Sequence, residues 1–551
     1  MFRDFLKRLQ VDVKEDGQAG LSNEDTKPLP PSRRTYGPWS FVILWVITGS
    51  FNIGGWTTGS SLIAYGLNVW QCMITVIVGN LIVGAMCVLS GAPGAKWHIG
   101  FPMIQRSAWG TRGFIFVIIQ RFFLACIWFS TQVFWGAECL KTFLTAVWPS
   151  YQKLNKPLAG GTMTTGDFLA FVLFTIFYLP LVFIKPERYK IPFLVCCAFI
   201  IPTVLALLIW FVSTAHGGGE LLHDVSAAGV TQAHGSYLAW MFVMGICTNI
   251  STISVHIFVQ SDYTRFARKP KDQILAQLIM VPLGTIVVAL IGIVCTSCAA
   301  KIFPETNGTL LWQPYQLLTQ LQTHYDNSSR SRVAVAFASL AFMLAQFGQV
   351  VANNGVAGGM DLSALLPRYF NMRRGMLALT CISFIVQPWQ LMNGASNFLT
   401  VLGGYGVFLG PMTGVMFCDY FIVRKRLYKL SDLYRTTSDS IYHFNHGVNW
   451  RAFVAWVLGV WITLPGFARM VQGGPPLPGW SNMNYFSWPL GTLISMTAFY
   501  LLNRLKPVAG LGQVDDEDYF SVEGPLTAVI ESQESDSGVE NIDGGRLGEK
   551  V

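Results

Sequence analysis

One apolar segment of the sequence carries two side chains that suit the binding of a flat, polar molecule. Trp128 and Gln132 stand four residues apart in "RFFLACIWFSTQVFWGAECL", and residues at this spacing share one face of a helix. An indole offers a flat surface for stacking, and a carboxamide offers one acceptor and two donors. The pair therefore fits a planar heterocycle with lactam or imide edges. The alternative is that Trp128 is an ordinary core or interfacial residue, although an unpaired amide at Gln132 would be costly at depth.

A second apolar segment, "AQFGQVVANNGVAGGMDLSALLPRY", carries four amide side chains. They belong to Gln346, Gln349, Asn353 and Asn354. Asn353 and Asn354 face about 100° apart on a helix, so at most one of them can point squarely into a central cavity. The alternative is that these amides form hydrogen bonds between helices.

Six ionisable residues lie in or beside apolar segments: Arg121, Glu138, His256, Asp262, Asp361 and Asp419. Ionisable groups inside a membrane are expensive and often functional. The three aspartates lie near segment ends beside Arg265, Arg368 and Arg424, which favours structural ion pairs or roles at helix ends. We therefore take His256 and Glu138 as the candidate proton carriers.

The sequence contains no nucleotide-binding P-loop, no zinc-type His/Glu motif and no catalytic-triad spacing. Cys295 and Cys298 have CxxC spacing, but they lie within an apolar segment without other metal ligands, and we interpret them as small core residues. These observations predict that the chain is not an enzyme and holds no metal or cofactor. Transport without an ATP-binding domain would be secondary, driven by an ion gradient.

The elements that must position these side chains are membrane spans. Of 551 residues, 52% are hydrophobic and only 12% are charged, which is too little charge to cover a soluble protein of this length. A span needs roughly 20 apolar residues. The candidate spans lie near 40–65, 69–92, 113–140, 166–184, 191–214, 237–260, 274–300, 332–357, 375–391, 396–422, 449–468 and 484–504. The sequence thus predicts an all-α polytopic membrane protein of twelve helices in a lipid bilayer.

The distribution of Lys and Arg between the loops indicates the orientation. Loops on one side hold 18 of these residues against 7 on the other, which places both termini in the cytosol. The net charge of +8 is then a topology signal and does not indicate a nucleic-acid partner. Two glycosylation sequons, at Asn307 and Asn327, fall in the long outer loop between the seventh and eighth spans.

The chain divides into three regions. Residues 1–38 form a polar cytosolic tail, residues 39–505 the twelve-helix transporter domain, and residues 506–551 an acidic cytosolic tail. The last region is rich in Asp, Glu, Ser and Gly and is expected to be disordered. The tails either contact trafficking or ubiquitination machinery or are simply solvated.

Two spans are interrupted by small and polar residues at mid-depth. They are the first, with "GSFNIGGWTTGSS" (49–61), and the sixth, with "GICTNISTISVH" (245–256). Broken helices at matching positions of two halves are typical of inverted-repeat transporters, whose solute site lies at the breaks. This pattern predicts five plus five inverted repeats of the LeuT-like type and two further C-terminal helices. Ordinary packing of small residues is the alternative.

Five motifs resemble the fungal Fur-type branch of the nucleobase–cation symporter-1 family. They are "FNIGGWTTGSSLIAYGL" (51–67), "QSDYTRFARKP" (260–270), "GGMDLSALLPRYFNMRRG" (358–375), "CDYFIVRKRLYKLSDLY" (418–434) and "GVNWRAFVAWVLG" (447–459). The resemblance spans roughly residues 25–505. It implies the inverted-repeat fold, a plasma-membrane location and proton-coupled uptake. Implied solutes are uracil, uridine, allantoin and uric acid, or the related thiamine and nicotinamide riboside group.

The resemblance also implies roles for individual residues. Trp128 matches the family's stacking tryptophan and Gln132 its hydrogen-bonding glutamine, while Asn354 matches its substrate-binding asparagine. The broken first span around 52–56, with Asn52 and Gly54, matches the segment that lines the site from the other side. The family's gate falls on Phe398, Leu402 and Tyr405.

Two positions depart from the family pattern. Many relatives carry a second stacking aromatic, usually Trp, nine positions before the Asp of "SDYTRFA", where this chain has Ile253. A frequent "GTN" run is Gly348-Gln349-Val350 here. Hydroxyl residues in this region bind sodium in bacterial relatives, so their absence favours proton coupling.

We therefore predict a proton-coupled importer of a nucleobase-like heterocycle that works by alternating access. A nucleoside or vitamin carrier of the same family is the first alternative, because a few side chains around a site decide specificity. A sensor that binds the solute without moving it is a remote alternative.

Overall fold

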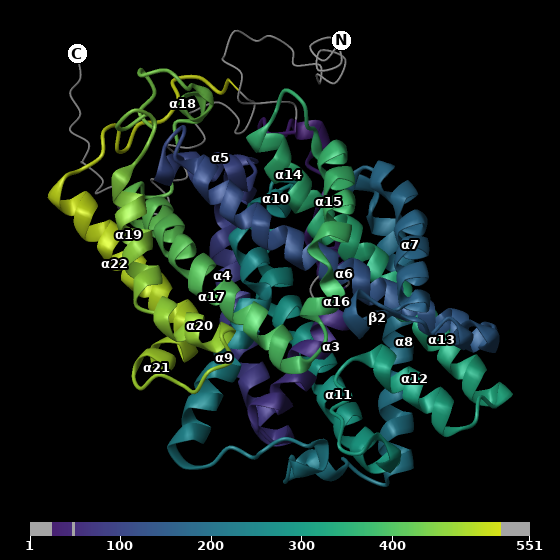
Figure 1. Ribbon diagram of the computed structural model, residues 1–551. Coiled ribbons are helices and arrows are strands. Elements are labelled where there is room, and N and C mark those ends of the chain that lie inside the picture. Colours follow the sequence, from purple (N-terminus) through teal and green to yellow (C-terminus); the bar gives the residue numbers. More distant parts are fainter. Residues whose placement is uncertain (1–24, 47–49, 520–551) are drawn as a thin grey trace, which may run out of the picture.

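Long apolar helices run through the described part of the chain, residues 25–46 and 50–519 of the computed structural model (Figure 1). Eight helices in this part are long and apolar enough to cross a membrane, or nine if the bent pair Trp450–Trp461 and Leu464–Val471 is one span. The chain is therefore a multi-pass, mostly helical membrane protein. The count of twelve spans stays a prediction.

The helices follow the apolar segments of the sequence. Those of the first part are α2 (Pro38–Trp45), α3 (Ile53–Ser60), α4 (Val69–Trp97), α5 (Phe101–Trp109), α6 (Phe114–Val147), α7 (Thr165–Tyr178) and α8 (Lys190–Ala215). Those of the middle part are α9 (Gly235–Phe258), α10 (Ser261–Thr264), α11 (Val281–Ile302), α12 (Pro314–His324), α13 (Ser329–Gly348), α14 (Val356–Leu365), α15 (Met372–Val386), α16 (Pro388–Leu391) and α17 (Ala395–Phe417). The last are α18 (Leu430–Tyr434), α19 (Trp450–Trp461), α20 (Leu464–Val471), α21 (Trp480–Tyr485) and α22 (Ser487–Leu505).

Short irregular elements join and interrupt these helices. The strands β1 (Pro157–Leu158) and β2 (Met163–Thr164) pair antiparallel, with Pro157 opposite Thr164. In the described part of the chain, π-helical turns widen long helices at Ala276–Met280, Gln349–Gly355 and Cys418–Val423. Such turns inside α-helices often mark functional sites.

The first span is broken, as the sequence predicts. Helix α2 ends at Trp45 and α3 begins at Ile53, with Asn52 as its N-cap: the Asn52 side chain accepts a hydrogen bond from the Gly55 amide at 3.0 Å. A Cβ atom at Gly55 would lie 2.1 Å from the Ser50 carbonyl oxygen, so the chain can double back here only past a glycine. Gly49, the first residue of the predicted break, lies outside the described residues.

The predicted interruption of the sixth span at 245–256 is wrong. Helix α9 is continuous from Gly235 to Phe258, and the chain leaves helical geometry only at Val259, before α10. Several polar side chains at 245–256 bond to carbonyls of their own helix. Asn249 donates to the Gly245 oxygen at 2.8 Å, and Thr252 donates to the Thr248 oxygen at 2.9 Å. Such bonds satisfy the polar groups without breaking the helix.

Two pairs of packed helices relate the first half of the chain to the second. Helix α4 packs against α9, and α3 packs against α11. Helix α3 belongs to the first predicted span and α4 is the second, whereas α9 is the sixth and α11 the seventh. Exchanging the first span with the sixth and the second with the seventh therefore turns one pair into the other. This symmetry supports the predicted inverted repeat, which remains a prediction in its details.

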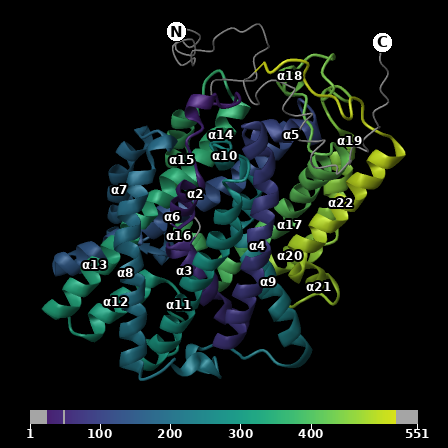
Figure 2. The same cartoon turned by 180° about the vertical axis from the view of Figure 1, so that it is seen from behind.

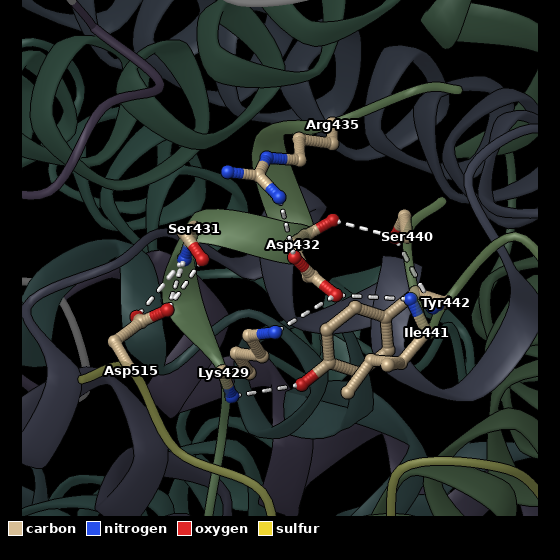
Figure 3. Close-up of polar contacts among 8 residues, drawn as sticks. All are labelled: Lys429, Ser431, Asp432, Arg435, Ser440, Ile441, Tyr442 and Asp515. Carbon is tan, nitrogen blue, oxygen red and sulfur yellow. Dashed lines mark hydrogen bonds and ion pairs between the residues drawn. The ribbon is translucent and has the colours of Figure 1, made fainter. Parts of the chain in front are cut away.

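One end of the bundle gathers α5, α10, α14 and α18 (Figures 1 and 2). Both ends of the described chain meet at α18: Tyr434 donates to the Thr26 oxygen at 2.9 Å, and the Ser431 amide donates to the Asp515 carboxylate at 3.0 Å (Figure 3). Arg451 holds the Lys506 oxygen at 2.7 Å. Residues 506–519, the start of the tail expected to be disordered, are thus placed against the bundle. The rest of that tail and residues 1–24 lie outside the described residues.

Candidate functional site

Several predicted site residues line one cavity beside the break in the first span. Its walls come from α2, α3, α6, α9, α11 and the π turn at Gln349–Gly355. The lining residues are Trp45, Asn52, Gly54, Gly55, Thr58, Trp128, Gln132, Thr252, Ile253, His256, Val281, Thr285, Gln349 and Asn353. The open space is about 30 Å³, roughly the volume of one water molecule in the liquid. A heterocycle can therefore enter only when lining side chains move.

Gln132 is held in place by a second buried amide. The Gln346 amide donates to the Gln132 side-chain oxygen at 2.8 Å and to its backbone oxygen at 3.1 Å. Both side chains are buried. With its oxygen occupied by Gln346, the Gln132 carboxamide presents its NH₂ group as a donor, and this group lies beside Gly54.

Trp128 stands within an aromatic cluster that includes predicted gate residues. Phe398 stacks on it with ring centroids 6.2 Å apart and planes 16° apart, and Tyr405 meets it edge-on at 6.1 Å. Tyr405 also donates to the Leu124 oxygen at 2.9 Å. Leu402 is buried on the same helix, α17. The structure thus places Phe398 where a stacked solute would approach Trp128.

Trp312 completes this cluster and is not among the residues predicted from the sequence. Its ring stacks on Phe398 with centroids 5.2 Å apart, and its carbonyl accepts from the Ser60 hydroxyl at 2.6 Å. Trp312 precedes α12 in a loop, where no helical periodicity reveals which way a side chain faces. The only feature of the sequence that points to Trp312 is its position just before Gln313 and Pro314, where α12 begins.

The two adjacent asparagines face different surroundings. Asn353 lines the cavity and donates to the Gln349 side-chain oxygen at 2.7 Å. The Tyr263 hydroxyl donates to the Asn353 carbonyl. The Asn354 amide instead donates to the Gln349 backbone oxygen at 3.1 Å. In this conformation the structure brings Asn353 to the cavity, and a substrate contact by Asn354 stays a prediction.

The two candidate proton carriers lie in different places. His256 is buried in the cavity wall. Glu138 is near the far end of α6 in an ion-pair cluster with Lys141, at 3.8 Å, while Lys141 also pairs with Asp167 of α7. Of the two, only His256 is among the cavity-lining residues.

The three aspartates near the span ends are buried, but two of them have partners other than the neighbouring arginine. Asp262 accepts a hydrogen bond from the Phe101 amide at 2.9 Å. Asp419 pairs with Arg424 at 3.2 Å, as predicted. Asp361 pairs with Arg121 of α6 instead of Arg368, because Arg121 is held over α14 by a 3.0 Å bond to the Ala357 oxygen. The spacing along the sequence could not reveal this partner from another helix.

The remaining predictions concern glycosylation and metal binding. Asn307 and Asn327 flank α12 in loops at the end of the bundle opposite α18 (Figure 1). Their glycosylation stays a prediction. Among the described residues, no three His, Cys, Asp or Glu side chains lie close enough together to hold a metal ion.

Comparison with known proteins gives a consistent result over almost the whole chain. Residues 28–491 match the model of a family described as permease for cytosine/purines, uracil, thiamine, allantoin. The allantoin permease of Saccharomyces cerevisiae is 33% identical over 512 residues, which cover 91% of this chain and 78% of that protein. The transporter aclS of Aspergillus oryzae is 30% identical over 569 residues, 93% of this chain and 91% of that protein.

Solved structures show the same fold. Mhp1, a nucleobase-cation-symport-1 family transporter in a closed conformation with bromovinylhydantoin bound, superposes with a TM-score of 0.67 at 19% sequence identity. The match covers 89% of this chain and 98% of Mhp1. MhsT, solved in complex with L-phenylalanine, gives a TM-score of 0.50 at 14% identity.

Proposed function

The chain belongs to the family of permeases for cytosine/purines, uracil, thiamine and allantoin, and from this membership we propose that it imports a nucleobase-like heterocycle together with protons. The protein is a membrane transporter and not an enzyme. The proposed solute class is that of uracil, allantoin and uric acid. The proposed setting is the plasma membrane with both termini in the cytosol, which the Lys and Arg distribution supports.

The observation that carries the proposal is the meeting of Trp128 and Gln132 at the broken first span. The two side chains line one cavity together with Asn52 and Gly54. An aromatic face and an oriented amide recognise a planar ring with polar edges. A cavity at a helix break is also where inverted-repeat transporters bind their solutes.

The proposed cycle is alternating access around this cavity. Phe398 moves off Trp128, the solute stacks in its place and bonds Gln132, and one bundle then tilts against the other to open the opposite side. His256 is the proposed proton carrier, because it is the titratable side chain in the cavity wall.

A nucleoside or vitamin carrier is the second candidate, and Ile253 favours it. Its aliphatic side chain lies in the cavity wall, where an aromatic residue would close a sandwich around a small base. A wall without that second ring admits a bulkier solute.

The deciding experiment is uptake of labelled uracil in cells that express the chain. We expect competition by bases, allantoin or uric acid, and loss of uptake in Gln132→Ala while the variant still reaches the cell surface. Normal uptake by Gln132→Ala would overturn the site assignment. Competition only by uridine, thiamine or nicotinamide riboside would favour the second candidate, and binding without accumulation would indicate a sensor.

A further inference from the structure

A second cavity opens on the side of the bundle that faces the bilayer. It is a groove of about 470 Å³ between α7, α8 and α13, within the size range of ligand-binding clefts. Its walls are aliphatic and aromatic side chains, apart from Tyr189 and Cys196, and the Cys196 thiol donates to the Leu344 oxygen at 3.3 Å. Phe177 and Val195 in these walls are about half exposed. Such a surface is suited to acyl chains.

The groove fits within one leaflet. Along the α13 helix and its π turn it extends from Met343 to Ala352, about 13 Å at 1.5 Å per residue. The hydrocarbon core of a bilayer is about 30 Å thick, so a single leaflet provides about 15 Å. The groove therefore matches an acyl chain from one leaflet.

Basic residues surround the end of the groove that lies near Ile184. Lys185 and Arg188 follow Ile184 in the chain and are exposed. Arg373 reaches the same place and donates to the Phe183 oxygen at 3.3 Å. The sequence of this stretch contains one acidic residue, Glu187. Positive charge at the membrane surface attracts anionic headgroups.

The groove and the solute cavity share the π turn at Gln349–Gly355. Gly348, Val351 and Ala352 line the groove, whereas Gln349 and Asn353 line the solute cavity. A π turn is less regular than the α-helix around it. A molecule packed against Val351 and Ala352 therefore affects the positions of the Gln349 and Asn353 side chains on the other face of the turn.

We propose that this groove binds an acyl chain of an anionic phospholipid, with the headgroup at Lys185, Arg188 and Arg373, and that the bound lipid supports transport by steadying the π turn. The leaflet is the one on the side of the Lys- and Arg-rich loops, which the proposed orientation makes the inner leaflet. The effect on transport rests on the proposed function, whereas lipid binding does not.

The binding test uses the full chain in nanodiscs of mixed phosphatidylserine and phosphatidylcholine. After extraction into detergent, lipids that remain on the protein are identified by native mass spectrometry. We expect retained phosphatidylserine to exceed its share of the disc several-fold. Val195→Trp, which fills the groove, should abolish retention. The double variant Lys185→Gln and Arg188→Gln should retain lipid without the preference for phosphatidylserine.

A matched control comes from the same helix. Ala206 of α8 lines a different lipid-facing groove of about 880 Å³, which α8 forms with α12 and α13 away from the π turn. Ala206→Trp should leave phosphatidylserine retention unchanged. Equal loss in Ala206→Trp and Val195→Trp, or retention without headgroup preference in the wild type, would overturn the proposal. A dimer that Val195→Trp dissociates would show that a second copy of the chain covers the groove and would also overturn it.

The transport test compares uptake by proteoliposomes with and without phosphatidylserine. We expect several-fold faster uptake with phosphatidylserine in the wild type and in Ala206→Trp, and no stimulation in Val195→Trp. Equal stimulation of Val195→Trp would overturn the coupling to the π turn. If no candidate heterocycle is taken up in either membrane, the proposed function fails, and the retention measurement still decides whether the groove binds lipid.

Discussion

At the scale of single residues, the Gln132 carboxamide is oriented by Gln346 and not by the cavity itself. The Gln346 amide donates to the Gln132 side-chain oxygen at 2.8 Å and to the Gln132 backbone oxygen at 3.1 Å, and both side chains are buried. A donor that is already in position loses less side-chain entropy when it binds a solute. Gln346 is therefore a positioning residue.

We expect Gln346→Leu to raise the KM for uptake about tenfold. The lost hydrogen bonds are each worth about 1 kcal/mol net, and 1.4 kcal/mol corresponds to a tenfold change in affinity. The measurement is the concentration dependence of uptake, corrected for protein at the surface. Gln320→Leu on α12, where Gln320 bonds the exposed Glu305, is the control and should leave KM unchanged. An unchanged KM in Gln346→Leu would contradict the positioning role.

The residues of the site differ in how well the sequence foretells them. Trp128 and Gln132 follow from their spacing on one helix, and His256 from its charge within an apolar segment. Trp312 and the Arg121–Asp361 pair depend on contacts between elements far apart in the chain. No local pattern encodes such contacts, so the sequence could not predict them.

At the scale of elements, one helix end shapes the site and another makes a buried contact away from it. The Asn52 cap starts α3 in the cavity wall, and Gly55 lets the preceding chain pass close to it. At the other end of the neighbouring span, His98 ends α4 in the left-handed conformation, with φ at 53°, and its Nδ1 contacts the Arg265 oxygen at 2.9 Å.

Gly55→Ala should reduce the yield and the thermal stability of the folded protein. The added Cβ would lie 2.1 Å from the Ser50 oxygen, and overpacking of this kind costs roughly 1–3 kcal/mol. Gly394→Ala is the matched control, because nothing lies within 4 Å of a Cβ there. Size-exclusion profiles and melting temperatures in detergent measure both. Equal melting temperatures for the two variants would contradict the close approach.

His98 should make stability depend on pH. Burial is the main cause that lowers the pKa of His98 from 6.5 to about 4. The hydrogen bond to the Arg265 oxygen opposes this shift, and the nearby charge of Arg34 adds to it. The unfolded chain therefore binds a proton at a higher pH than the folded chain, and stability falls as the pH drops from 6.5 towards 4. We expect a smaller fall in melting temperature over this window in His98→Asn, because asparagine also tolerates a positive φ. An identical pH profile would show that His98 does not contribute.

The elements themselves were largely predictable, because runs of apolar residues mark them. The prediction at 245–256 is wrong because hydroxyl and amide side chains are compatible with both a break and a continuous helix. Asn249 and Thr252 instead bond within α9. The sequence gives the residue types, whereas the choice between a break and an intrahelical bond depends on packing.

At the scale of the whole molecule, the bundle has a central cavity and, at one end, a set of contacts around α18. Arg106 of α5 donates to the Leu433 oxygen at 2.9 Å. Helix α18 bonds Thr26 through Tyr434, and it bonds Asp515 through Ser431, the contact that Figure 3 shows. Helices α5 and α18 and the two ends of the described chain are thus joined at this end of the bundle.

Proton coupling is a property of the whole cycle and has a direct test. We expect a protonophore to collapse uptake and replacement of sodium to leave it unchanged, because the chain lacks the hydroxyl run at 348–350. The measurement is initial uptake in energised cells, with potassium or choline in place of sodium. A strict sodium requirement would contradict the coupling.

The π turn at Gln349–Gly355 has a consequence for the identity of the amide in the cavity. A π turn contains an additional residue compared with α geometry, and successive residues of an α-helix are 100° apart. If the turn slips by one residue towards α geometry, Asn354 rotates to the place that Asn353 now occupies. Asn353 and Asn354 then occupy the same position in the cavity wall in turn, and each presents a carboxamide there.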